Sequence, residues 1–311
     1  MRRWFLACAA LLLAACESVP ALPEFRDRTP VDIAGFFDCV RERSLTVIAA
    51  HRGGDQPAEN AIATFERTLG GAPGPVLIEI DVRRTRDGVL VLMHDETLDR
   101  TTNGAGPVAA IDAAAFRRLK LKDEGGRVLD ASPPTLQQAL EWSRNRVIVQ
   151  LDVKRGTPFE EVVAAVRAAR AENRAVIITY NTADAFRVHR LAPELMISAS
   201  PETIRELEGA AYAPVDFSRF LAWTGTREPD PALNVSLAQK GVEVAFGTLG
   251  RPETSWDGRF AREGDAGYTA FADTGLHIIS TDRPLEAMRA IDDVDGEGAP
   301  ATACLAARRT S

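Results

Sequence analysis

The chain has no excess of positive charge. Its 37 lysines and arginines are outnumbered by 44 aspartates and glutamates, and the formal net charge is −7 at pH 7. A nucleic-acid-binding surface needs a concentration of lysine and arginine. The sequence therefore predicts that the protein does not bind nucleic acid. Histidine and cysteine are equally scarce, with four residues of each. Because they are few, the position of each one is informative.

No apolar run is long enough to span a membrane. Residues 4–15 (WFLACAALLLAA) follow a basic start, MRR, but they are shorter than the roughly 20 residues of a spanning helix. This pattern is typical of an export signal. Residues 13–16 (LAAC) resemble the lipobox of bacterial lipoproteins, which predicts a signal peptide over 1–15 and a lipidated Cys16. An ordinary signal peptide cut near Ala15 is the alternative.

Both alternatives place the mature protein outside the cytoplasm. The lipobox specifically predicts a lipid-anchored protein of the bacterial cell envelope that faces the periplasm. Cys8 would leave with the signal peptide and Cys16 would carry lipid, so Cys39 and Cys304 remain. An oxidising compartment permits a disulfide between these two, and two separate thiols are the alternative.

The 311 residues can form one large domain or two of ordinary size. Residues 17–30 contain three prolines and mixed charges, as expected of a tether. We therefore predict a tether and N-terminal segment over 16–40, one domain over 41–295 and a C-terminal tail over 296–311. The sequence does not indicate an oligomeric state.

Short apolar runs alternate with longer amphipathic segments along the predicted domain. The runs are bounded by turn residues and rich in β-branched side chains, which predicts strands. They cover residues 45–51, 76–82, 147–153, 175–180, 195–200, 220–224, 242–248 and 276–281, with a further short strand at 89–94. Helices are expected between them, among them one at 59–70, one capped by Thr135 and one at 158–173.

Eight strands alternating with helices predict a parallel sheet that closes into a TIM (β/α)8 barrel. An open doubly wound sheet is the structural alternative. That fold favours a G-x-G-x-x-G turn after a strand, and the sequence has no such motif.

Acidic residues and histidines occur where the predicted strands end. Glu79 and Asp81 are two residues apart, so they lie on the same face of a strand. Their neighbours are apolar, which predicts that the acids point into the barrel rather than into solvent. Adjacent carboxylates repel unless a cation compensates, and a hard divalent metal is the simplest compensation.

The strand at 147–153 repeats this arrangement with Asp152 for the metal and Lys154 for an anion. His51 and His94 end strand-like runs near the acids, and imidazole titrates near neutral pH, so both are candidates for acid–base catalysis. His189 and His277 are expected to be structural.

The motifs AHRG, EN, EIDV, DGVLVLMHDETLDRTTNGAG, PTLQQAL and IISTDRP together resemble the glycerophosphodiester phosphodiesterases. The resemblance implies a TIM barrel that hydrolyses glycerophosphodiesters to an alcohol and glycerol 3-phosphate with Ca²⁺ or Mg²⁺. It places the general acid–base pair on His51 and His94. It also implies that Glu79, Asp81 and Asp152 bind the metal. The phosphate would be bound by Arg52, Asn60 and Lys154.

Three features depart from the family pattern. Asp152 stands where a glutamate is common, residues 242–258 lack a tryptophan-containing strand motif, and His277 replaces a frequent aspartate. The expected substrate is a small glycerophosphodiester. A phospholipase C-like or D-like enzyme acting on intact lipid and a non-catalytic barrel that binds a phosphorylated ligand are the alternatives.

Overall fold

The computed structural model describes residues 28–54, 56–209, 215–295 and 300–309. The predicted signal peptide and the lipidation site Cys16 lie outside these residues. Among the residues described, no helix is both long enough and apolar enough to cross a membrane.

Eight parallel strands form a closed barrel, which confirms the predicted TIM fold. The barrel closes because β1 pairs with β2 on one side and with β9 on the other. Its strands are β1 (Val47–Ala50), β2 (Val76–Arg84), β4 (Ile148–Val153), β5 (Ala175–Ile178), β6 (Met196–Ala199), β7 (Phe220–Trp223), β8 (Glu243–Gly247) and β9 (Ile278–Thr281). Every strand predicted for the barrel is present, and the open-sheet alternative is wrong.

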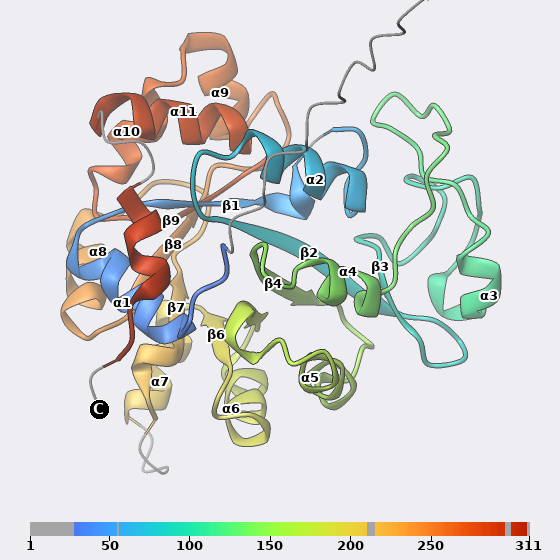
Figure 1. Cartoon of the computed structure of the whole chain (residues 1–311), viewed down its shortest axis with the longest axis horizontal. Coiled ribbons are helices and arrows are strands. Elements are labelled where there is room, and N and C mark those ends of the chain that lie inside the picture. The colour runs from blue at the N-terminus through green and yellow to red at the C-terminus, as the bar shows by residue number, and fades with distance from the viewer. Residues whose placement is uncertain (1–27, 55, 210–214, 296–299, 310–311) are drawn as a thin grey trace, which may run out of the picture.

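Helices surround the barrel (Figure 1). They are α2 (Ile62–Gly71), α4 (Leu136–Trp142), α5 (Phe159–Ala168), α6 (Thr182–Leu191), α7 (Pro201–Gly209), α8 (Pro231–Gln239), α9 (Trp256–Glu263), α10 (Ala266–Ala272) and α11 (Pro284–Asp295), with 3-10 turns η3 (Glu172–Arg174) and η4 (Phe217–Arg219). Thr135 caps α4 through a capping box with Gln138, as predicted. A core of aliphatic side chains fills the space between these helices and the outer faces of the strands.

Helix α1 (Ile33–Glu42) covers the end of the barrel where the strands begin. Its apolar side chains share one core with residues from inside the barrel, including Leu221 of β7. The 3-10 helix η5 (Pro300–Ala306) packs beside α1 (Figure 1), and a disulfide joins Cys39 to Cys304. The folded unit therefore extends beyond the predicted limits of 41 and 295.

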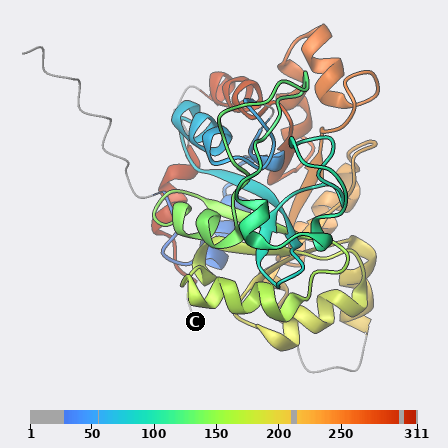
Figure 2. The same cartoon turned by 90° about the vertical axis from the view of Figure 1, so that its right-hand side faces the viewer.

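A small insertion leaves the barrel between β2 and β4. Strand β3 (Leu90–Leu92) pairs antiparallel with β2, and η2 (Val108–Ala110) and α3 (Ala113–Phe116) follow it. These elements have a satellite core built around Met93, Leu98 and Phe116. Figure 2 brings the insertion to the front of the barrel. It matters for the site because it carries His94, Asp95 and Arg100.

Candidate active site

The two acidic side chains of β2 point into the barrel. Ile78 and Ile80 pack in the core between strands and helices, whereas Leu77 belongs to the core inside the barrel. Because a strand alternates its faces, Glu79 and Asp81 share the inward face of Leu77. This confirms the direction predicted from the sequence.

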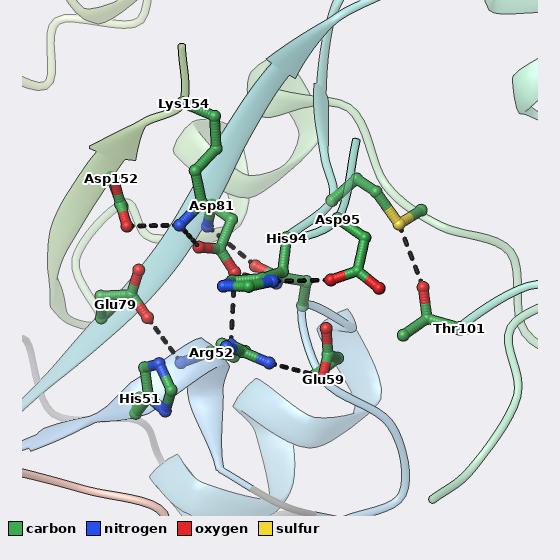
Figure 3. A network of polar contacts seen from close by, with 12 residues as sticks. His51, Arg52, Glu59, Glu79, Asp81, His94, Asp95, Thr101, Asp152 and Lys154 are labelled. Carbon is green, nitrogen blue, oxygen red and sulfur yellow. Dashed lines mark hydrogen bonds and ion pairs between the residues drawn. The ribbon is translucent and has the colours of Figure 1, made fainter. Parts of the chain in front are cut away.

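Glu79 and Asp81 of β2 and Asp152 of β4 form a buried acidic triad inside the barrel (Figure 3). Asp81 and Asp152 are neighbours in the parallel register, and one oxygen from each of the three acids lies within 4.8 Å of the others. Lys154 lies between two of them, with Nζ 2.7 Å from Asp81 Oδ1 and 2.6 Å from Asp152 Oδ2.

The three acids of the triad lie close enough to disfavour the ionisation of one another. Burial raises the pKa of Glu79 to about 8, and the charge of Asp81 adds to this effect. Burial also opposes ionisation of Asp81, but Lys154 and Arg52 outweigh it and hold the pKa of Asp81 below its usual value. A charge cluster of this kind is stabilised by a further cation.

The donor set fits a hard divalent cation. All three ligands are carboxylates, and Asp152 Oδ1 is buried with no hydrogen-bond partner among the described residues. Glu79 Oε2 accepts one hydrogen bond, from the backbone N–H of Arg52, at 2.7 Å. Oxygen ligands of this type suit Ca²⁺ or Mg²⁺.

His51 and Arg52 begin the 3-10 turn η1 (His51–Gly53), which directly follows β1. His51 Nδ1 lies 2.7 Å from Asp282 Oδ1, which follows β9. Burial lowers the pKa of His51, but the hydrogen bond with Asp282 and the charge of Glu79 outweigh it, and the pKa is raised overall. The carboxylate therefore orients this ring and favours its protonated form.

His94 has a matching carboxylate partner. Its Nδ1 lies 2.7 Å from Asp95 Oδ1, and Arg100 grips both oxygens of Asp95, with Nε 2.7 Å from Oδ2 and Nη2 3.0 Å from Oδ1. This grip holds the pKa of Asp95 far below its usual value. Asp95 is thus an anion that fixes the orientation of the imidazole.

A chain of ion pairs connects the two histidine-bearing segments, and Figure 3 shows its contact between Arg52 and Glu59. Arg100 also donates to both oxygens of Glu59, each at 2.8 Å, and Glu59 accepts a further bond of 2.9 Å from Arg52. Arg52 has a left-handed backbone, with φ of 52°, which costs energy for a residue with a side chain. Its backbone N–H reaches Glu79 from this conformation.

Asn60 is buried and is bound to Asp81 through both ends of its amide. The Nδ2 group donates to Asp81 Oδ2 at 2.6 Å, and Oδ1 accepts from the Asp81 N–H at 3.0 Å. Of the three residues predicted to hold phosphate, Arg52 and Lys154 line the cavity, whereas the contacts of Asn60 organise the acidic triad.

A cavity of about 520 Å³ opens at the ends of the barrel strands. It is lined by both candidate catalytic histidines, His51 and His94, and by Glu79 and Asp152 of the triad. His189 lies on α6 and His277 is buried beside β8, where its Nδ1 accepts from the N–H of Val244. The structure thus places His51 and His94 at the cavity, whereas His189 and His277 do not line it.

Sequence reasoning missed four residues of the site: Asp95, Arg100, Asp282 and Tyr180. Asp95 and Arg100 stand in the motif that contains His94, and Asp282 stands in IISTDRP, so the motifs held a signal that was not used. Tyr180 follows β5, and its hydroxyl donates to Asp152 Oδ2 at 2.6 Å. No sequence pattern identified Tyr180.

The fold and the site define a class: a TIM barrel with two oriented histidines beside a carboxylate triad. The model of the glycerophosphoryl diester phosphodiesterase family matches residues 51–198. A probable glycerophosphodiester phosphodiesterase 1 of Mycobacterium tuberculosis is 32% identical over 192 residues, which is 54% of this chain and 69% of that protein. The chain belongs to the glycerophosphodiester phosphodiesterase family.

Other relatives agree. A glycerophosphodiester phosphodiesterase of Caldanaerobacter subterraneus is 34% identical over 161 residues, and this match spans 49% of the chain and 65% of the relative's length. The crystal structure of a glycerophosphoryl diester phosphodiesterase from Parabacteroides distasonis superposes with a TM-score of 0.68 at 29% identity, covering 86% of this chain and 88% of that one. The first of these relatives is named as a glycerophosphodiester phosphodiesterase and the second as a glycerophosphoryl diester phosphodiesterase.

Proposed function

We propose that the protein is a metal-dependent hydrolase that converts glycerophosphodiesters to an alcohol and sn-glycerol 3-phosphate. The observation that carries this proposal is the joint placement of two carboxylate-bound histidines with the acidic triad at one cavity. Membership of the family supports the substrate class.

The substrate is an anion, and the cavity offers positive charge to receive it. Arg52 and Lys154 both line the cavity, and an arginine can grip phosphate oxygens through two parallel hydrogen bonds. Glu79, Asp81 and Asp152 would hold Ca²⁺ or Mg²⁺, which when bound supplies charge neutralisation at the phosphoryl oxygens. Asn60 keeps Asp81 in place for this role.

The histidines carry out the proton transfers. Because Nδ1 of each ring is bound to a carboxylate, Nε2 is the nitrogen that remains to exchange a proton with substrate. One ring accepts the proton of the nucleophile, and the other donates a proton to the departing alkoxide. The nucleophile is either water or the 2-hydroxyl of the glycerol group. In the second case a cyclic phosphate forms as the alcohol departs, and water then opens it to glycerol 3-phosphate.

The small diester is favoured over intact lipid. Among the described residues, the exposed large hydrophobic side chains are Val31, Val128, Tyr180 and Val235. Only Tyr180 of these lines the cavity, and an interfacial lipase needs a contiguous apolar surface.

We further propose that the protein is a lipoprotein of the bacterial cell envelope, anchored through Cys16 and facing the periplasm. The sequence of residues 1–16 supports this proposal, and the disulfide between Cys39 and Cys304 suits an oxidising compartment.

The test is release of glycerol 3-phosphate from a panel of glycerophosphodiesters by full-length protein in detergent, with EDTA, Ca²⁺ or Mg²⁺. We expect release that requires a divalent ion and falls at least 100-fold in His51→Ala and in His94→Ala. His189→Ala serves as the matched control and should retain activity. Metal-independent release, or full activity in either site variant, would contradict the proposed mechanism.

A further inference from the structure

The cavity has a charged half and an uncharged half. Its charged lining residues all come from the segments β1 to β4: His51, Arg52, Glu79, His94, Asp152 and Lys154. The described residues that line it from β5 to β9 carry no charged side chain. The apolar ones among them are Ile178, Tyr180, Trp223, Ala245, Leu249 and Ile278.

Trp223 is the largest side chain of the uncharged half. It lies two residues after Leu221 on β7 and packs against the same core inside the barrel, so its ring points inward. In the order of the strands around the barrel, β7 is diametrically opposite β2. The indole therefore faces the acidic triad across the cavity.

Gly247 provides the space that the indole occupies. A Cβ atom at this position would lie 2.6 Å from Cη2 of Trp223, closer than such atoms approach, and 3.0 Å from Cζ2. The outer edge of the ring thus rests on the backbone of β8, and the half-buried residue keeps surface at the cavity. Residues 242–258 lack the tryptophan-containing strand motif of the family, and here Trp223 of the preceding strand lies against Gly247 of that segment.

Resting on the proposed function, we propose that the uncharged half is the subsite of the departing alcohol, and that Trp223 selects an alcohol with a quaternary ammonium group. The phosphate is held at the triad, Arg52 and Lys154, so its substituents extend from that end. The glycerol hydroxyls need hydrogen-bond partners, which the charged half supplies. The other half also carries the hydroxyl side chains of Thr179, Ser198, Ser200 and Ser280 beside its apolar residues. The opposite wall remains for the alcohol.

The chemistry of this wall suits a methylated cation. A tryptophan face attracts a quaternary ammonium group through its π-electrons, and such a group has no N–H that requires an acceptor. Tyr180 adds a second aromatic ring to the wall and is tied by its hydroxyl to Asp152. An anionic alcohol finds no cationic side chain among the described residues of this half.

The experiment compares kcat/KM for glycerophosphocholine and glycerophosphoglycerol in wild type, Trp223→Leu and Trp223→Phe, with full-length protein and the activating metal. We expect wild type to have the higher kcat/KM for glycerophosphocholine. In Trp223→Leu this value should fall roughly tenfold, while kcat/KM for glycerophosphoglycerol stays the same. Trp223→Phe should keep part of the preference because it keeps a ring. Trp142→Phe, outside the barrel on α4, is the matched control and should change neither value.

The outcomes separate the two proposals. If wild type hydrolyses both diesters and Trp223→Leu shows the same ratio of kcat/KM for glycerophosphocholine to kcat/KM for glycerophosphoglycerol, Trp223 does not select the alcohol. A wild-type preference for glycerophosphoglycerol also overturns the inference. Both results leave the proposed function intact. If Trp223→Leu fails to fold, Trp223→Phe and Gly247→Ala replace it, because an alanine at position 247 displaces the Trp223 ring. A ratio of the two kcat/KM values that is unchanged from wild type in both variants then overturns the inference. Absence of hydrolysis of every diester by wild type refutes the proposed function and this inference with it.

Discussion

At the scale of single residues, the two candidate catalytic histidines are held by carboxylates from different places. Asp95 is the next residue after His94, whereas Asp282 comes from the far end of the chain to bind His51. The backbone holds Asp282 in turn, because Gly250 N–H donates to its Oδ2 at 2.9 Å and its own N–H donates to Asp257 at 2.7 Å.

Asp282→Ala should lower kcat by roughly 100-fold, because the His51 ring loses the partner that fixes its tautomer and orientation. KM should change little, since Asp282 does not line the cavity. The measurement is the kcat and KM of glycerol 3-phosphate release. Asp265→Asn, which removes a carboxylate paired with Arg283 on the surface, is the control, and an equal loss in both variants would argue against a positioning role.

Arg100→Gln should lower kcat by roughly tenfold, because Arg100 holds both Asp95 and Glu59 and so orients His94 and Arg52 together. Its side chain is half exposed, so the melting temperature should shift by little. Arg86→Gln breaks an exposed pair with Asp112 next to the same insertion and should leave kcat unchanged. If Arg100→Gln loses activity only because it melts at a lower temperature, Arg100 does not act by orienting His94 and Arg52.

At the scale of elements, local patterns predicted the strands and the directions of their side chains. The two-residue spacing of Glu79 and Asp81 places both on one face in any strand, and Thr135 caps α4 by contacts within four residues. The residues around His277 show the opposite case. Only the approach of β8 to β9 places the N–H of Val244 at its ring.

His277 should make the protein less stable in acid. Burial lowers the pKa of His277 from 6.5 to about 4, and Nδ1 must stay unprotonated to accept from Val244. The unfolded chain therefore binds the proton more readily than the folded one. The contribution of neutral His277 to the free energy of unfolding is complete above pH 6.5. It is lost as the pH falls from 6.5 to 4, and the loss reaches up to roughly 3 kcal/mol.

Urea unfolding at pH 7.0, 5.5 and 4.5 measures this effect. His277→Asn, whose amide oxygen can replace Nδ1 as acceptor, should show a smaller loss of unfolding free energy between these pH values. His189→Gln is the control and should flatten the dependence less, because His189 is only half-buried. Parallel curves for wild type and His277→Asn would show that His277 does not titrate in this range.

At the scale of the whole molecule, the two ends of the folded chain meet at one end of the barrel. Cys39 of α1 and Cys304 of η5 are 265 residues apart in sequence, and their Cα atoms lie 5.6 Å apart. Helix α1 is also fixed to the barrel by an ion pair between Arg41 and the buried Glu243 of β8. These contacts close the face opposite to the site.

Reducing the disulfide should lower the melting temperature by roughly 5–10 °C, since a cross-link over a long loop stabilises by about 2–4 kcal/mol. Calorimetry of wild type with and without dithiothreitol measures this change. The double variant Cys39→Ser/Cys304→Ser should melt at the lower temperature and should not respond to reductant. An identical melting temperature for reduced and oxidised wild type would contradict the prediction.

The sequence alone determined the barrel strands, the shared face of Glu79 and Asp81 and the cap of α4, because the backbone imposes these relations over a few residues. Its motifs also indicated the histidines, the acids and the family. Only the tertiary structure decided which carboxylates support His51 and His94, which wall faces the triad, and that Cys39 meets Cys304. Such partners are distant along the chain, and closure of the barrel and packing of its ends bring them together.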